Sequence, residues 1–66
     1  MNEMLKDLLE YRERVKKQLD DLEFKINAVL VEGELDKALE LSKVMDSTFN
    51  YYRVIEKEIE KVEKNF

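Results

Sequence analysis

The sequence predicts an all-α fold, an antiparallel two-helix hairpin that forms one domain of residues 1–66. Three observations predict this fold. Apolar residues recur every three or four positions along most of the chain, which is the spacing of one helix face. The chain contains no proline, and its single glycine, Gly33, lies at the middle. At 66 residues the chain is long enough for one small domain with a marginal core.

The first helix is expected near residues 3–31. Asn2 is a suitable N-cap, and Glu3 and Asp7 add negative charge near the helix start, where the helix dipole favours it. Apolar residues alternately four and three positions apart form one stripe, which we call the seam. In this helix the seam contains Met1, Leu5, Leu8, Val15, Leu19, Leu22, Ile26 and Val29, with Arg12 as its polar member.

Gly33 separates this helix from a second one, which is expected near residues 35–64. A lone glycine between two periodic segments indicates a helix C-cap, because glycine adopts the left-handed backbone without steric cost. Glu34 and Asp36 place negative charge at the start of the second helix. Its part of the seam contains Ala38, Leu41, Met45, Thr48, Tyr52, Ile55, Ile59, Val62 and Phe66.

The sustained seam in both segments predicts coiled-coil packing, and the short connection makes the helices antiparallel neighbours. Each helix would be about 40–45 Å long. Tyr11 and Tyr51 are expected to flank the seam, and Glu60 and Lys64 to form an i,i+4 ion pair. Two alternatives stay open at this point: a monomeric hairpin, or a homodimer in which two hairpins form a four-helix bundle.

Composition excludes several classes of function. The chain has 16 acidic and 12 basic residues and a net charge of -4, so it has no basic surface for nucleic acid or for an anionic membrane. It contains no cysteine and no histidine, which excludes thiolate and imidazole chemistry and the usual zinc ligands. No apolar run approaches the roughly 18 residues of a membrane span. We therefore expect a cytoplasmic protein without a metal site.

The second helix carries another stripe, which the core does not explain. Its members are also alternately four and three residues apart, and it lies about a quarter turn or more from the seam. Apolar residues at both ends flank a polar centre, and Asn50 lies at the outer edge, one turn after the central aspartate. We call this set the outer stripe: Leu35, Leu39, Ser42, Asp46, Phe49 and Arg53.

Two interpretations of the outer stripe compete. It is typical of a contact surface for another protein, in which apolar anchors surround a polar group with a specific partner. Alternatively, Leu35, Leu39 and Phe49 pack against a second copy of the hairpin, and Asp46 is a surface charge. The pattern alone favours the second interpretation, because helical hairpins commonly complete their cores by pairing.

A sequence motif that includes Ser42 and Asp46 of the outer stripe favours the first interpretation, a contact surface for another protein. Residues 39–46 read Leu-Glu-Leu-Ser-Lys-Val-Met-Asp, and residues 50–53 read Asn-Tyr-Tyr-Arg. This segment resembles the signature of the stage-zero sporulation-regulatory aspartyl-phosphate phosphatases of spore-forming bacteria, which carry a Ser-Gln-Glu-Leu-Asp motif in the second helix of a small hairpin. Ser42 and Asp46 match at the same spacing and Met45 replaces leucine, whereas Lys43 and Val44 depart from the glutamine and glutamate of that motif.

The resemblance implies an enzyme that removes phosphate from the aspartyl phosphate of a response-regulator receiver domain and so negatively regulates sporulation initiation. The receiver domain would supply Mg²⁺ and a lysine, so the enzyme needs no cofactor of its own and only a group that orients the attacking water. The resemblance assigns this role to Asp46, with Ser42 beside it. The partner-binding residues would be Leu35, Leu39, Phe49, Asn50 and Arg53; the identity of the regulator stays open.

Other interpretations of these residues remain. The chain can instead be a non-catalytic helical binding module or a coiled-coil oligomerisation module. Ser42 can donate its hydroxyl to the Ala38 carbonyl within the helix. Arg53 can form an i,i+3 pair with Glu56, and Tyr51 is expected to pack between the helices rather than contact a partner.

Overall fold

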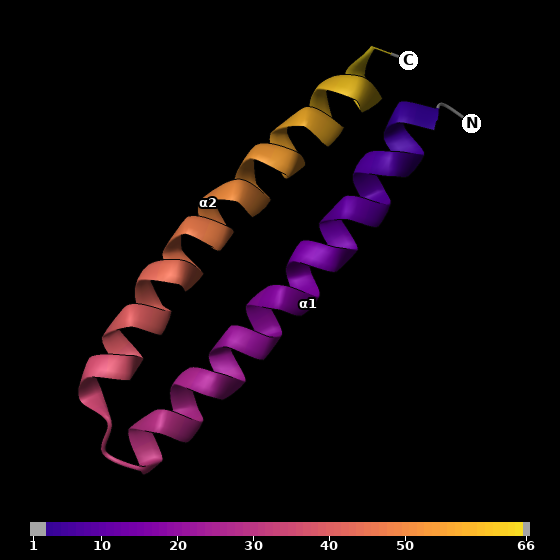
Figure 1. The fold of residues 1–66 in the computed structure, drawn as a ribbon. Helices are drawn as coiled ribbons and strands as arrows, with labels where there is room; N and C mark the ends of the chain where they lie inside the picture. Colours follow the sequence, from indigo (N-terminus) through magenta and orange to yellow (C-terminus); the bar gives the residue numbers. More distant parts are fainter. Residues whose placement is uncertain (1–2, 66) are drawn as a thin grey trace.

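The computed structural model describes residues 3–65, which form two helices joined by a short turn. Helix α1 runs Glu3–Val31 and helix α2 runs Leu35–Lys64. They lie side by side and antiparallel in a rod of 50 × 15 × 11 Å (Figure 1). These bounds confirm the predicted hairpin. The predicted N-cap Asn2 and the seam positions Met1 and Phe66 lie outside the described residues.

The turn between the helices depends on Gly33. Its φ of 78° is in the left-handed region. Its N–H donates to the Leu30 carbonyl at 3.0 Å, and the Glu34 N–H donates to the Val29 carbonyl at 2.9 Å. This pair of bonds is a Schellman motif, which satisfies two carbonyls at the end of α1. A Cβ at Gly33 would meet no atom within 4 Å, so the requirement for glycine comes from the backbone alone.

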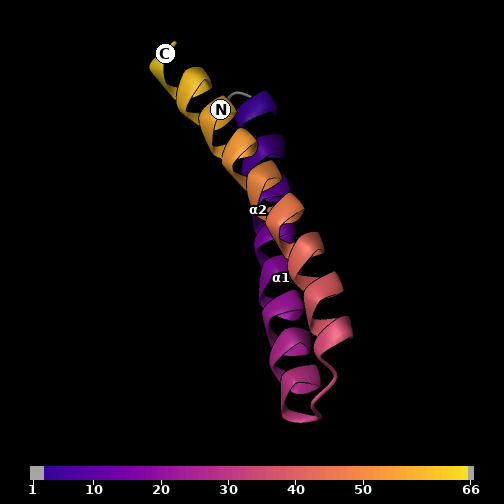
Figure 2. The ribbon, with the colours of Figure 1, turned by 90° about the vertical axis from the view of Figure 1, so that its left-hand side faces the viewer.

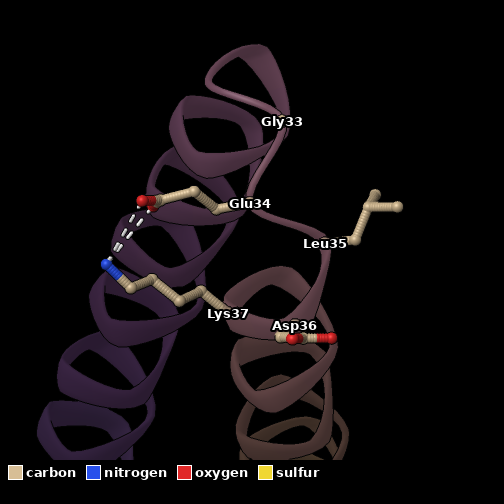
Figure 3. A pocket seen from close by; sticks show the side chains of 5 residues that line it. All are labelled: Gly33, Glu34, Leu35, Asp36 and Lys37. Atoms are coloured by element: carbon tan, nitrogen blue, oxygen red, sulfur yellow. Dashed lines mark hydrogen bonds and ion pairs between the residues drawn. The ribbon is translucent and has the colours of Figure 1, made fainter.

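Helix α2 begins with local charge pairing (Figure 3). Lys37 Nζ lies 3.3 Å from Glu34 Oε2, and Asp36 lies in the first turn, where the helix dipole stabilises its charge. The Glu34 carbonyl accepts the Ala38 N–H at 3.1 Å and so begins the helical hydrogen bonds. The Leu35 side chain points away from both helices in this view. The first apolar residue of α2 is therefore left for contact outside the hairpin.

The core follows the predicted seam. Val15, Ile55 and Ile59 form the buried cluster, and Ala38 is buried nearer the turn. The other described seam residues are half-buried. Figure 2 shows the helices crossing at a shallow angle, as expected for seam-to-seam packing. Leu9 also packs against the cluster, although it lies beside the predicted seam and not on it.

The structure places four ion pairs among the described residues, three between neighbours along the chain and one, Arg12 with Glu56, between the helices. Lys64 Nζ lies 3.1 Å from Glu60 Oε1, which confirms the predicted i,i+4 pair. Thr48, a polar member of the seam, donates its hydroxyl to the Val44 carbonyl at 2.8 Å and so brings no unpaired hydroxyl into the interface.

In the described part of the chain, neither helix is long and apolar enough to cross a membrane.

Candidate functional site

The outer stripe occupies the surface of α2 as expected from its spacing. Leu35 and Leu39 are 64% and 63% exposed, and Phe49 is 45% exposed. Asp46 and Arg53 are also exposed, whereas Ser42 is half-buried. The stripe therefore presents both its apolar ends and its polar centre to solvent. Asn50 is exposed at the edge, as expected.

Asp46 is the central feature of this surface. It lies in the middle of α2, eleven residues or more from either helix end, so the surrounding helical turns hold its backbone rigidly. Among residues 3–65 no side chain or backbone group forms a hydrogen bond or ion pair with its carboxylate. The carboxylate is thus available to a group outside the hairpin.

Ser42 lies one turn before Asp46 on the same face, which places the two Cβ atoms about 5–6 Å apart. The alternative in which its hydroxyl donates to the Ala38 carbonyl is not observed, because no hydrogen bond joins these residues. A hydroxyl and a carboxylate at this spacing can contact one small polar group together, such as a water molecule or a phosphoryl oxygen.

Phe49 is held in place by its neighbours. Its ring stacks against the seam residue Tyr52, with ring centroids 6.5 Å apart and an interplanar angle of 25°. The Arg53 guanidinium carbon lies 5.2 Å from the centroid of the Phe49 ring. No ion pair joins Arg53 and Glu56 in the described residues, and Glu56 Oε2 instead lies 4.0 Å from Arg12 Nη1 of α1. The aromatic anchor and its cation are therefore arranged before any partner arrives.

The turn end of the molecule adds apolar surface that the sequence analysis did not assign to the site. Leu30 and Val31, the last two residues of α1, are 46% and 88% exposed. Because α1 ends at Val31 and α2 begins at Leu35, these residues lie at the turn end of the hairpin together with Leu35; Figure 1 shows the turn joining the two helices at this end. Their positions off the seam were a signal for exposure, but only the fold shows that the turn brings them to the leucine end of the outer stripe.

On the flank of α2 opposite the outer stripe, Tyr51 contacts a residue of α1. Tyr51 donates its hydroxyl to the Tyr11 hydroxyl at 3.3 Å, and the ring centroids are 5.8 Å apart. This contact between the helices confirms that both tyrosines flank the seam. The hydrogen bond from Tyr51 to Tyr11, together with electrostatic repulsion between the two groups, raises the pKa of Tyr51 above its ordinary value of 10.0.

The acidic side chains are spread along both helices. Within residues 3–65 no group of three or more aspartates and glutamates is arranged to hold an ion. Asp46 is therefore not part of a described cluster of three or more acidic side chains.

Comparison of the chain with protein-family models, curated proteins and solved structures found no match. The functional interpretation therefore depends on the geometry of the outer stripe and on the motif residues Ser42 and Asp46.

Proposed function

We propose that the chain is a protein aspartyl-phosphate phosphatase that dephosphorylates a response-regulator receiver domain in the cytoplasm and so negatively regulates sporulation initiation. The observation that carries this proposal is the exposed Asp46 carboxylate. It has no partner among the described residues, lies within a rigid helix, and is flanked by Ser42 and by exposed apolar side chains.

The chemistry requires little from the enzyme. A water oxygen attacks the phosphorus in line, the bond between phosphorus and the aspartyl oxygen breaks, and that oxygen leaves with the electron pair as part of a carboxylate. Asp46 accepts a hydrogen bond from the attacking water and can take its proton, while Ser42 donates a hydrogen bond to a phosphoryl oxygen. The receiver domain would contribute the magnesium ion and the lysine that offset charge on the transferring phosphoryl group.

The apolar ends of the outer stripe give a means of docking. Leu39 and Phe49 lie on either side of Asp46 and are separated by about 15 Å along the helix. When a partner covers both anchors, water is excluded around the carboxylate, which strengthens its interaction with the reacting water. Arg53 lies over the Phe49 ring and can pair with an acidic group at the rim of the interface.

A second function shares the same surface. The exposed leucines and Phe49 also suit a binding module that holds a receiver domain without hydrolysing it. Under that alternative, Ser42 and Asp46 would be ordinary contact residues. Catalytic turnover separates the two functions, because a binding module acts only in proportion to its own amount.

The experiment is a phosphate-release time course with a phosphorylated receiver domain, Mg²⁺ and a small molar fraction of the hairpin. We expect many turnovers for the wild type and none above background for Asp46→Ala. Asp20→Asn is the matched control, because Asp20 is an exposed aspartate on α1, and it should keep full activity. Loss of phosphate that stops at one equivalent of the hairpin, or binding without phosphate release, would contradict the proposal in favour of the binding module.

A further inference from the structure

A second apolar surface lies on the back of α1, the side that faces away from α2. Phe24 lies two residues after the seam residue Leu22, which is a rotation of about 200° around the helix. Val31 has the same relation to the seam residue Val29. Ala28 lies between Phe24 and Val31 and is also exposed. Because these residues are four and three positions apart, they form one row, which we call the back stripe: Phe24, Ala28 and Val31.

The back stripe holds the two most exposed of the large apolar side chains in residues 3–65. Val31 is 88% exposed and Phe24 is 76% exposed. The Phe24 ring contacts no other described aromatic ring, whereas Phe49 of the outer stripe stacks on Tyr52. Single exposed apolar residues are ordinary, but Phe24 and Val31 share a face and lie about 10 Å apart along the helix. That arrangement gives a partner two anchor points.

The half of the hairpin that carries the back stripe is acidic. Within fifteen residues of Gly33 on either side, at positions 18–48, the chain has eight acidic and three basic residues. The rest of the chain has eight acidic and nine basic residues. The net charge of -4 therefore arises entirely from the turn half, where the most exposed apolar side chains also lie.

Acidic side chains border the back stripe at both ends. Asp20 and Asp21 lie one turn before Phe24 on α1, and Glu32 directly follows Val31. None of these three carboxylates forms an ion pair with another described residue. Their charge is thus available to a cation outside the hairpin.

The end of α1 has little positive charge of its own. Glu23 and Lys25 lie on either side of Phe24, and Lys25 is the single basic residue of positions 18–32. The last turn of α1 contains no basic residue. The helix dipole places negative partial charge at this end, which a basic side chain commonly offsets. Both the side chains and the helix end therefore favour a cationic partner.

These charges select among the possible occupants of the back stripe. A nucleic acid or an anionic membrane surface would be repelled, since both carry negative charge. A second copy of the hairpin would bring the same excess of carboxylates against its partner. A helix that carries both apolar and basic side chains matches the apolar row and its acidic border together.

We infer that the back stripe binds a basic amphipathic helix of another protein. The partner presents apolar residues at positions i, i+4 and i+7, which match the spacing of the stripe, and lysine or arginine on the flanks of that apolar row. The surface is separate from the outer stripe, because the back stripe belongs to α1 and the outer stripe belongs to α2. This inference does not depend on the phosphatase activity.

The test is an NMR titration of the isotope-labelled hairpin with a synthetic helical peptide of about 14 residues, with leucines on one side and lysines on the other. We expect backbone amide shifts to change at residues 20–32 and not around Asp46. Phe24→Gln and Val31→Gln should each raise the peptide dissociation constant at least about tenfold, because each removes an anchor. Phe49→Gln is the matched control on the outer stripe and should leave the constant unchanged.

Removal of charge tests the acidic border separately. The double variant Asp20→Asn, Asp21→Asn should raise the dissociation constant by about fivefold and make it less sensitive to salt. The matched control is Glu10→Gln with Glu13→Gln, which removes two carboxylates of α1 that lie about three turns or more from Phe24. This control should have little effect. Far-ultraviolet circular dichroism checks that each variant stays helical.

Four results would overturn the inference. The leucine–lysine peptide could fail to bind, or a peptide with glutamate in place of lysine could bind as tightly. Equal weakening by Phe49→Gln and Phe24→Gln would place the peptide site on the outer stripe. Self-association of the free hairpin that Phe24→Gln abolishes would assign the back stripe to a second copy of the chain.

Discussion

The seam and the outer stripe of α2 have the same spacing along the same helix but opposite surroundings. Ile55 and Ile59 of the seam are buried against α1, whereas Leu39 and Asp46 of the stripe are exposed. Spacing therefore predicts which residues share a face but does not say what covers that face. Chemistry distinguishes the two, because the stripe places a carboxylate between apolar residues, and a carboxylate is costly to bury without a partner.

The largest expected effect is on the free energy of unfolding, which a substitution in the seam should lower much more than one in the outer stripe. Ile55→Ala should lower the free energy of unfolding by about 2–4 kcal/mol, since it opens a cavity in the buried cluster. Leu39→Ala on the outer stripe should change it by less than about 0.5 kcal/mol, because the side chain is largely exposed. Urea unfolding followed by circular dichroism measures both. Equal losses would mean that the stripe is packed within the folded protein.

A smaller effect is expected for partner binding. Phe49→Ala should weaken binding to a receiver domain by about 2 kcal/mol, the range of an aromatic interface anchor. The matched control is Phe24→Ala, because Phe24 is also an exposed phenylalanine but lies on α1, away from the outer stripe. Isothermal titration calorimetry measures both variants. If Phe24→Ala weakened binding as much as Phe49→Ala, the docking surface would have to be reassigned.

The smallest effect concerns Tyr11 and Tyr51, which are exposed like the outer stripe but contact each other across the two helices. Tyr11→Phe removes the hydroxyl that accepts the hydrogen bond from Tyr51, so the pKa of Tyr51 should fall toward 10.0. Because folding raises this pKa, the stabilisation is present below pH 10.0 and is lost as the pH rises through the raised value. Ring-labelled tyrosine NMR measures the titration; an unchanged Tyr51 curve would contradict the assignment of the shift to this bond.

Local signals explain why the sequence predicts most of the fold. The seam and Gly33 act within a few residues, and the helix bounds near 3–31 and 35–64 agree with α1 and α2. Glu60 and Lys64 are one turn apart, so helix geometry alone predicts their pair.

Contacts between the helices could not be predicted in the same way, because they depend on the register that the turn sets. Arg12 of α1 pairs with Glu56 of α2, whereas Arg53 lies over the Phe49 ring and forms no pair with Glu56. The contact between Tyr11 and Tyr51 also joins the two helices, so it depends on the same register. The outer stripe was predictable as a surface, but its roles in catalysis and docking remain predictions.

The most direct test of the central claim is the hydrolysis rate of Asp46→Asn with a phosphorylated receiver domain at saturating concentration. Asparagine keeps the size of the side chain but cannot take a proton from the attacking water. The account predicts a rate reduced by about 100-fold or more, with receiver binding and helicity unchanged. A variant that hydrolyses the aspartyl phosphate as fast as the wild type would contradict it, and the outer stripe would then be a binding surface without a catalytic carboxylate.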